Sequence, residues 1–157
     1  MEAQNFEIDK VDLDILSILI ENANTPYTDI AKKILVSAGT IHVRMNKLEK
    51  MGVVKNATLI INPIKLGFDL TAFLGIYLEK GSIYNDVIKE LQQIPEVVEA
   101  YYTTGAYSIF AKIVCRNTEH LRSVLNDKIQ PIDGIQRTET FISLEESIKR
   151  TVSLGQF

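Results

Sequence analysis

Apolar residues in the first third of the chain recur at the period of an α-helix. A first helix is predicted over residues 11–22, because apolar positions share one face, namely Leu13, Leu16 and Ile20. The sequence Asn-Ala-Asn-Thr-Pro at 22–26 breaks this pattern. A second helix is predicted to begin near Tyr27 and to bury Ile30, Ala31 and Ile34.

The third predicted helix covers residues 38–50 and has recognisable ends. Ser37 is a favourable N-cap residue, and Gly52 follows the last periodic position. One face is apolar, with residues at i, i+4 and i+7, namely Ile41, Met45 and Leu48. The opposite face presents Gly39, Val43, Asn46 and Lys50. Because about four residues separate the second and third helices, this pattern predicts a helix-turn-helix.

Residues 53–63 alternate between apolar and polar side chains, which predicts a small β-wing. Pro63 and Gly67 then indicate a linker. We therefore expect a winged helix-turn-helix domain at residues 1–62, a linker at 63–69 and a second domain at 70–157.

The second domain has another order of predicted elements. Strands are expected at 70–79, 97–104, 107–115 and 135–144, and amphipathic helices at 83–94 and 118–129. Asn117 is the expected cap of the second helix, and Gly105 with Ala106 forms the turn of a hairpin. The order β-α-β-β-α-β is the ferredoxin-like arrangement, so the whole chain is predicted to be α+β.

Two helices can cover only one face of a four-stranded sheet, so the other face stays open. Some of the aromatic residues expected there are too apolar to remain in water, namely Phe73, Tyr101, Tyr107 and Phe110. Contact between the sheets of two copies would cover them. The pattern therefore predicts a homodimer.

Charge is distributed unevenly along the 157 residues, whose net charge is −3. Residues 1–31 carry −6, residues 32–55 carry +5 and the remainder carries −2. A positive region on a predicted helix-turn-helix is what binding to double-stranded DNA requires. A solvated helix face without any partner would explain the same charges, and both interpretations stay open at this point.

The candidate DNA-contacting residues lie in and before the third helix. Arg44 sits beside the apolar stripe, so it is a candidate either for a phosphate contact or for a structural ion pair. His42 is a candidate base contact or an ordinary surface histidine. The full predicted set is Lys33, Ser37, Gly39, Thr40, His42, Val43, Arg44 and Lys47.

The sequence contains no arrangement that predicts catalysis or metal binding. Cys115 is the only cysteine, and His120 has no nucleophile or carboxylate at a catalytic spacing, so no catalytic residue, metal site or cofactor is expected. No apolar run reaches the length of about 18 residues that a membrane span needs. The acidic N-terminus does not resemble a secretory signal. We expect a cytoplasmic protein.

A second candidate site is the hairpin sequence Thr-Thr-Gly-Ala-Tyr-Ser. Its turn would expose backbone N–H groups and hydroxyls that can hold a carboxylate and an ammonium group, although a plain hairpin would have the same sequence features. The residues concerned are Thr103, Thr104, Gly105, Ala106, Tyr107 and Ser108. On the last strand, the candidates for recognising a side-chain amide are Gln136, Thr138 and Thr140.

Four segments together resemble the Lrp/AsnC family of transcription regulators, and the asparagine-responsive type most closely. They are Gly-Thr-Ile-His-Val-Arg at 39–44, Leu-Glu-Lys-Met-Gly-Val-Val at 48–54, residues 100–110 around the hairpin, and Asp-Gly-Ile-Gln-Arg-Thr-Glu-Thr at 133–140. The resemblance covers nearly the full chain. It implies an N-terminal winged helix-turn-helix and a C-terminal effector-binding domain. It also implies homodimers that assemble into larger even-numbered oligomers, often octamers, with an amino acid bound between dimers.

Three positions depart from the family pattern, and one of them is Ala38, where proline often follows the helix cap. Leu35 stands where the helix-turn-helix turn usually has glycine, which predicts a strained or different turn. Ser108 stands where many members have aspartate, which favours a neutral, amide-bearing effector such as asparagine. Two alternatives remain: an architectural DNA-binding protein of weak specificity, and an enzyme like the tetrapyrrole decarboxylases that share this two-domain arrangement.

Overall fold

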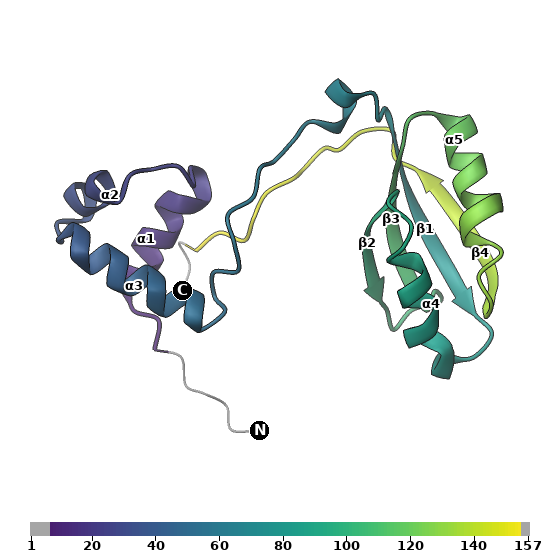
Figure 1. Ribbon diagram of the computed structural model, residues 1–157, viewed down its shortest axis with the longest axis horizontal. Helices are drawn as coiled ribbons and strands as arrows, with labels where there is room; N and C mark the ends of the chain where they lie inside the picture. Colours follow the sequence, from purple (N-terminus) through teal and green to yellow (C-terminus); the bar gives the residue numbers. More distant parts are fainter. Residues whose placement is uncertain (1–6, 155–157) are drawn as a thin grey trace. The chain divides into compact units, whose positions relative to one another are not determined.

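Three helices form the first of two structural units in the computed structural model, which describes residues 7–154. The helices are α1 (Lys10–Glu21), α2 (Tyr27–Ile34) and α3 (Ala38–Lys50) (Figure 1). Ile15, Ile30, Ile41 and Leu48 are fully buried between them. The three predicted helices and the buried stripe of α3 are confirmed.

Side chains at the helix N-termini explain where α1 and α3 begin. The backbone N–H of Asp12 donates to the Asp9 carboxylate at 3.0 Å, and the N–H of Asp9 donates back to the Asp12 carboxylate at 3.2 Å. The Ser37 hydroxyl accepts from the N–H of Thr40 at 3.0 Å, as predicted for a cap. These bonds satisfy N–H groups that have no partner within the helix.

The turn between α2 and α3 contains the one non-glycine residue with positive φ among residues 7–154. Leu35 has φ 58° and ψ 45°, and its side chain is 91% exposed. A left-handed conformation costs a residue with a Cβ about 1–2 kcal/mol. The turn therefore keeps the left-handed geometry, and Leu35 adopts it under strain.

The predicted wing strand does not form in the described chain. Residues 53–62 are extended but pair with no other strand, and Leu59 and Ile60 are 87% and 86% exposed. The alternation at 53–63 indicated a strand, but a strand also needs a neighbour to satisfy its backbone groups. A turn of 3₁₀-helix follows at Pro63–Leu66.

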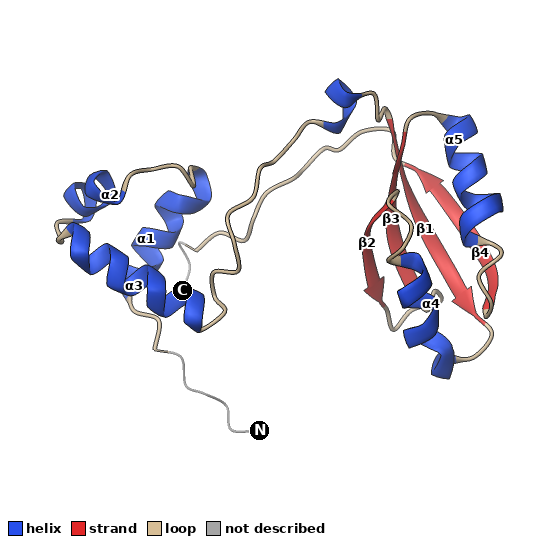
Figure 2. Cartoon of the chain, viewed as in Figure 1, coloured by secondary structure: helices blue, strands red, loops and turns tan. Residues whose placement is uncertain are grey.

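The second unit, Ile61–Ser147, contains one antiparallel sheet of order β2-β3-β1-β4. Figure 2 shows the strands of this sheet in red and the helices that lie against it in blue. The elements are β1 (Leu70–Leu78), α4 (Tyr84–Leu91), β2 (Val97–Tyr102), β3 (Ile109–Cys115), α5 (Thr118–Ser123) and β4 (Ile135–Ile142), with a 3₁₀ turn at Gly81–Ile83 and π-helical turns at Val124–Ile129 after α5. The predicted ferredoxin-like order is confirmed.

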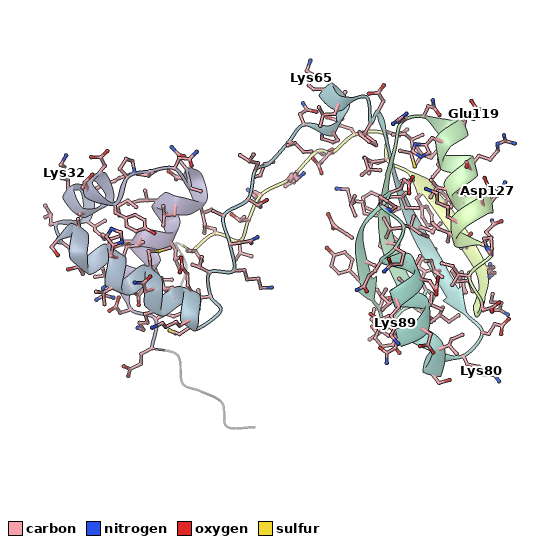
Figure 3. The ribbon with its side chains drawn as sticks, in the orientation of Figure 1. Lys32, Lys65, Lys80, Lys89, Glu119 and Asp127 are labelled. Atoms are coloured by element: carbon pink, nitrogen blue, oxygen red, sulfur yellow. The ribbon has the colours of Figure 1, made fainter. Side chains whose placement is uncertain are left out.

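The helices cover one face of this sheet. Alternate residues of β1 and β3 are buried on that face with apolar residues of the helices, including Leu74, Ile113, Val87 and Leu121. Charged side chains such as Lys89, Glu119 and Asp127 project from the outer side of the helical segments (Figure 3).

The other face of the sheet is covered by no helix of the second unit, and it is aromatic. The rings of Phe73 and Phe110 stack with centroids 5.9 Å apart, and the ring of Tyr107 lies over Gly75. A Cβ at Gly75 would collide with that ring, so glycine is required there. Phe141, on β4, is 46% exposed on the same face.

Candidate nucleic-acid interface and effector site

The surface of α3 is divided into a buried stripe and an outward stripe. Ile41, Met45 and Leu48 are buried against α1 and α2. The opposite side of the helix exposes Gly39, Val43, Asn46 and Lys50. This outward stripe is the part of the helix that can enter a groove of DNA without unfolding the domain.

Ser37 and Thr40 hold each other at the N-terminus of α3. Besides the cap bond, their hydroxyl oxygens lie 2.8 Å apart. Thr40 is half-buried, whereas Gly39 is exposed. Ser37 and Thr40 are therefore occupied by bonds within the protein. Gly39 has no side chain, so it leaves the helix N-terminus accessible.

Arg44 and Lys47 bond to groups at and before the N-terminus of α1. The Arg44 guanidinium donates to Asp9 at 2.7 Å and to Asp12 at 2.8 Å. The Lys47 ammonium donates to the backbone oxygen of Glu7 at 2.9 Å and lies 3.5 Å from the Asp12 carboxylate. Asp12 is fully buried, and Arg44 is 25% exposed. The geometry is that of a structural ion pair for Arg44, whereas Lys47, 44% exposed, remains within reach of solvent.

The same ion pairs shift the titration of their members. Hydrogen bonds from the Arg44 guanidinium hold the pKa of the Asp9 carboxyl below its ordinary value. The same bonds, with Asp9 first and Asp12 second, raise the pKa of Arg44. Both shifts favour the charged forms, so the contact between α1 and α3 is ionic at neutral pH.

His42 and Lys33 occupy the remaining predicted positions. The His42 ring meets the Tyr27 ring edge-on, with centroids 4.6 Å apart at 70°. This contact joins α3 to the start of α2. Lys33, in the last turn of α2, is exposed and makes no ion pair with residues 7–154.

The hairpin between β2 and β3 forms the second candidate site. The N–H of Thr103 donates to the oxygen of Ser108 at 3.1 Å, the N–H of Ser108 donates to the oxygen of Ile76 at 2.9 Å, and the Thr103 hydroxyl bonds to the oxygen of Tyr107. Thr104, Gly105 and Ala106 at its tip are exposed. The hairpin is thus closed by its own bonds and anchored to β1.

Gly105 is not required for the geometry of this turn. Its φ lies outside the left-handed region, and a Cβ built there would meet nothing within 4 Å. A side chain at Gly105 would therefore not block the turn. What Gly105 leaves is free space above the hairpin.

A polar cluster that the sequence analysis missed holds Tyr107. Its hydroxyl donates to Glu139 at 2.9 Å, and the Tyr77 hydroxyl donates to the other carboxylate oxygen at 3.1 Å. Arg137 lies 3.0 Å from Glu139 and stacks on the Tyr77 ring at 3.7 Å. These bonds hold the side chain of Tyr107 on the open face of the sheet.

The charge of Glu139 is stabilised by its neighbours. Hydrogen bonds from Tyr107 and then Tyr77 lower the pKa of Glu139. The same carboxylate raises the pKa of Tyr107, and burial followed by Glu139 raises that of Tyr77. No pattern in the sequence pairs these residues, because Tyr77 and Glu139 stand 62 positions apart.

Gln136, Thr138 and Thr140 lie on the edge strand β4. Thr138 pairs with Ile76 and Thr140 with Leu74, so both belong to the helix-covered face. Gln136 and Thr138 line an open pocket of about 360 Å³. The other residues that line it are Gln130, Ile135 and Arg137.

The structure brings the two candidate effector sets to one end of the sheet without joining them. Ile76 of β1 pairs with Ile109 beside the hairpin and with Thr138 of β4. Because β1 lies between them, β3 and β4 are about 10 Å apart. Within one chain, the hairpin and the β4 residues therefore do not close around a single small molecule.

The remaining titratable groups provide no catalytic arrangement within residues 7–154. His120 Nδ1 accepts from the N–H of Arg116, and Nε2 lies 3.1 Å from Glu96, which also pairs with Lys128 at 2.7 Å. His120 is half-buried, and both of its ring nitrogens have partners. Cys115 is buried, and burial raises the pKa of its thiol.

The described residues hold neither a metal-binding cluster nor a membrane-spanning helix. In that part of the chain no three His, Cys, Asp or Glu side chains gather as metal ligands would. No helix there has the length and apolar character needed to cross a bilayer.

Comparisons with known proteins agree with this division of the chain. The model of the Lrp/AsnC ligand binding domain matches residues 71–153, and a winged helix-turn-helix DNA-binding model matches residues 8–55. Regulatory protein AsnC of Escherichia coli is 46% identical over 149 residues, which is 95% of this chain and 98% of that protein. Regulatory protein AsnC of Haemophilus influenzae is 49% identical over 145 residues, covering 92% and 97% of the two chains.

The solved structure of Escherichia coli AsnC has a TM-score of 0.89 and 45% identity, covering 93% of this chain and 98% of that one. The relatives are named as regulators, and the helix-turn-helix surface described above is of the kind that binds DNA. The chain is therefore a DNA-binding transcription regulator and belongs to the Lrp/AsnC family.

Proposed function

We propose that the chain regulates transcription in the cytoplasm in response to asparagine. The observation that carries this is the end of the sheet where the exposed hairpin tip, residues 104–106, and the pocket beside Gln136 and Thr138 both lie. Asparagine is zwitterionic and has a neutral amide. Backbone N–H groups and the Thr104 hydroxyl suit its carboxylate and ammonium groups, and the Gln136 amide can both donate to and accept from its side chain.

We propose that the effector site is completed by a second copy of the chain. The hairpin and β4 lie too far apart in one chain to surround an amino acid, so the hairpin of one protomer would meet β4 of another. Asparagine would then bind between protomers and alter their assembly. A homodimer through the open aromatic face, itself assembled into a larger even oligomer such as an octamer, provides both contacts.

We propose that α3 is the DNA-recognition helix of each protomer. Its exposed stripe and the free Lys33 face outward, while Lys47, although it bonds to Glu7 and Asp12, is exposed enough to reach a phosphate as well. In a two-fold dimer, two such helices require pseudo-palindromic sites with half-sites about one helical turn apart. Ser37, Thr40, His42 and Arg44 support the helix, and Gly39 and Val43 lie in the stripe itself.

Isothermal titration calorimetry with asparagine, aspartate, glutamine and leucine tests the effector. Asparagine should bind best, and aspartate roughly tenfold to a hundredfold more weakly, because an extra charge facing unsatisfied acceptors costs about 1–3 kcal/mol. Best binding by leucine would contradict the proposal. A flat response to every amino acid would favour the architectural alternative, in which DNA binding has no effector.

The variant Gly105→Val tests the site. It should keep its fold, because Cβ has room at this position and φ is not left-handed. It should lose asparagine affinity by roughly tenfold or more while retaining DNA affinity, since the new side chain fills the space above the hairpin. Thr28→Val, an exposed position of α2, is the control. Normal asparagine binding by Gly105→Val would show that the hairpin is not the site.

A further inference from the structure

Most of the candidate DNA contacts on or beside α3 are already held by other parts of the protein. Ser37 caps the helix and Thr40 bonds to Ser37. His42 packs on the Tyr27 ring, and Arg44 and Lys47 make ion pairs to the N-terminal end of α1. A side chain that contacts a base edge must not already be bonded within the protein. The exposed residues of α3 that have no such bond are therefore the ones that can contact bases.

The uncommitted side chains of α3 lie in the outward stripe. Val43 is 70% exposed, and Asn46 is exposed and makes no side-chain hydrogen bond within residues 7–154. Gly39 adds no side chain, and Lys50 lies in the last turn of the helix. Val43 and Asn46 are therefore the stripe's central pair.

Their spacing matches that of neighbouring base pairs. Three residues of helix rise about 4.5 Å, and base pairs are stacked about 3.4 Å apart. Residues at i and i+3 also point to the same side of a helix. Val43 and Asn46 can therefore meet one base pair or two adjacent ones in a major groove.

The chemistry of this pair selects one kind of base pair. Asparagine donates to adenine N7 and accepts from its N6 amino group in a bidentate contact, and an aliphatic side chain packs on the thymine methyl group. We propose that Val43 and Asn46 are the specificity-determining residues of α3 and read adjacent A·T pairs in each half-site. This inference rests on the proposed role of α3 as the recognition helix.

Selection of binding sites from random duplex DNA by the full-length protein tests the inference. The wild type should enrich half-sites with A·T at two adjacent positions. Asn46→Ala should lose the preference at one of them and weaken the selected site by roughly tenfold to a hundredfold. Val43→Ala should relax the neighbouring position and weaken binding by roughly threefold to tenfold.

The salt dependence separates this role from a general loss of affinity. Neither variant changes charge, so the slope of log affinity against log salt should stay as in the wild type. Asn24→Ala, an exposed asparagine in the turn between α1 and α2, is the matched control and should select the wild-type motif. Both positions on α3 are exposed, so thermal unfolding should be unchanged.

Two results would overturn the inference in different ways. If Asn46→Ala and Val43→Ala select the same motif as the wild type, base reading lies elsewhere and the regulator function stands. If the wild type enriches no sequence at all, α3 does not read bases, and the proposed role of the helix fails together with the inference.

Discussion

At the scale of one residue, Leu35 gives the turn between α2 and α3 its left-handed geometry at a cost in conformational free energy. Its left-handed conformation is imposed by the short connection between α2 and α3, and its exposed side chain contributes no burial in return. The N–H of Leu35 bonds to the oxygen of Ala31, and the N–H of Val36 bonds to the same oxygen, so the backbone of the turn is satisfied. The cost of this conformation therefore comes from the steric conflict of the Leu35 Cβ with its own backbone, and not from an unsatisfied N–H group.

Leu35→Gly should stabilise the protein. Glycine removes the cost of about 1–2 kcal/mol for a left-handed residue but loses about 0.5–1 kcal/mol through greater freedom of the unfolded chain, so a net gain of about 0.5–1 kcal/mol is expected. Chemical denaturation measures this as a higher midpoint with an unchanged slope. Leu59→Gly, at a similarly exposed leucine without positive φ, should show no gain. A less stable Leu35→Gly would mean that the exposed side chain has an unrecognised contact.

At the scale of elements, α1 and α3 are joined by charges that titrate. Asp9 and Asp12 accept from Arg44, and the pKa of Asp9 is lowered in the folded state. A carboxyl with a lowered folded pKa stabilises the fold fully above its ordinary pKa. That stabilisation is lost as the pH falls through the folded value.

The free energy of unfolding should therefore fall below about pH 3.8, and Asp9→Asn should flatten this part of the pH profile. In Arg44→Met the pKa of Asp9 should rise toward its ordinary value, because its main hydrogen-bond donor is gone. Carboxyl chemical shifts followed by NMR during an acid titration measure this directly. An Asp9 pKa that is the same with and without Arg44 would contradict the ion pair.

The elements also show what the sequence can and cannot predict. The bounds of α3 were predictable because Ser37 and Gly52 mark its ends locally, and the order of strands and helices followed from periodicity. The ion pair of Arg44 was only one of two open readings, since its partners Asp9 and Asp12 stand 35 and 32 positions earlier. The predicted wing strand is absent for a related reason. Alternation indicates that a segment can form a strand and says nothing about its neighbour.

At the scale of the whole molecule, the second unit leaves one face of its own sheet without a covering helix. Phe73, Phe110 and Phe141 share that face with Tyr107, whose hydroxyl group is satisfied by Glu139. A surface of this kind presents apolar rings around a polar cluster with no unpaired carboxylate oxygen. Burying it against a second copy would remove the rings from water without leaving Glu139 unpaired, which is the condition for a favourable interface.

Phe141→Glu should weaken this association. The side chain is 46% exposed in one chain, so the substitution costs the fold little, whereas a sheet-to-sheet dimer would have to bury a new charge from each protomer. Light scattering at micromolar concentration should show the wild type as a dimer or larger even assembly of 17.7 kDa chains and the variant shifted toward the monomer. Lys89→Glu, on the outer side of α4, changes charge by a larger step and should leave the mass unchanged. A wild type that scatters as a 17.7 kDa monomer would show that the aromatic face needs no partner, and the proposed two-chain effector site would then have no basis.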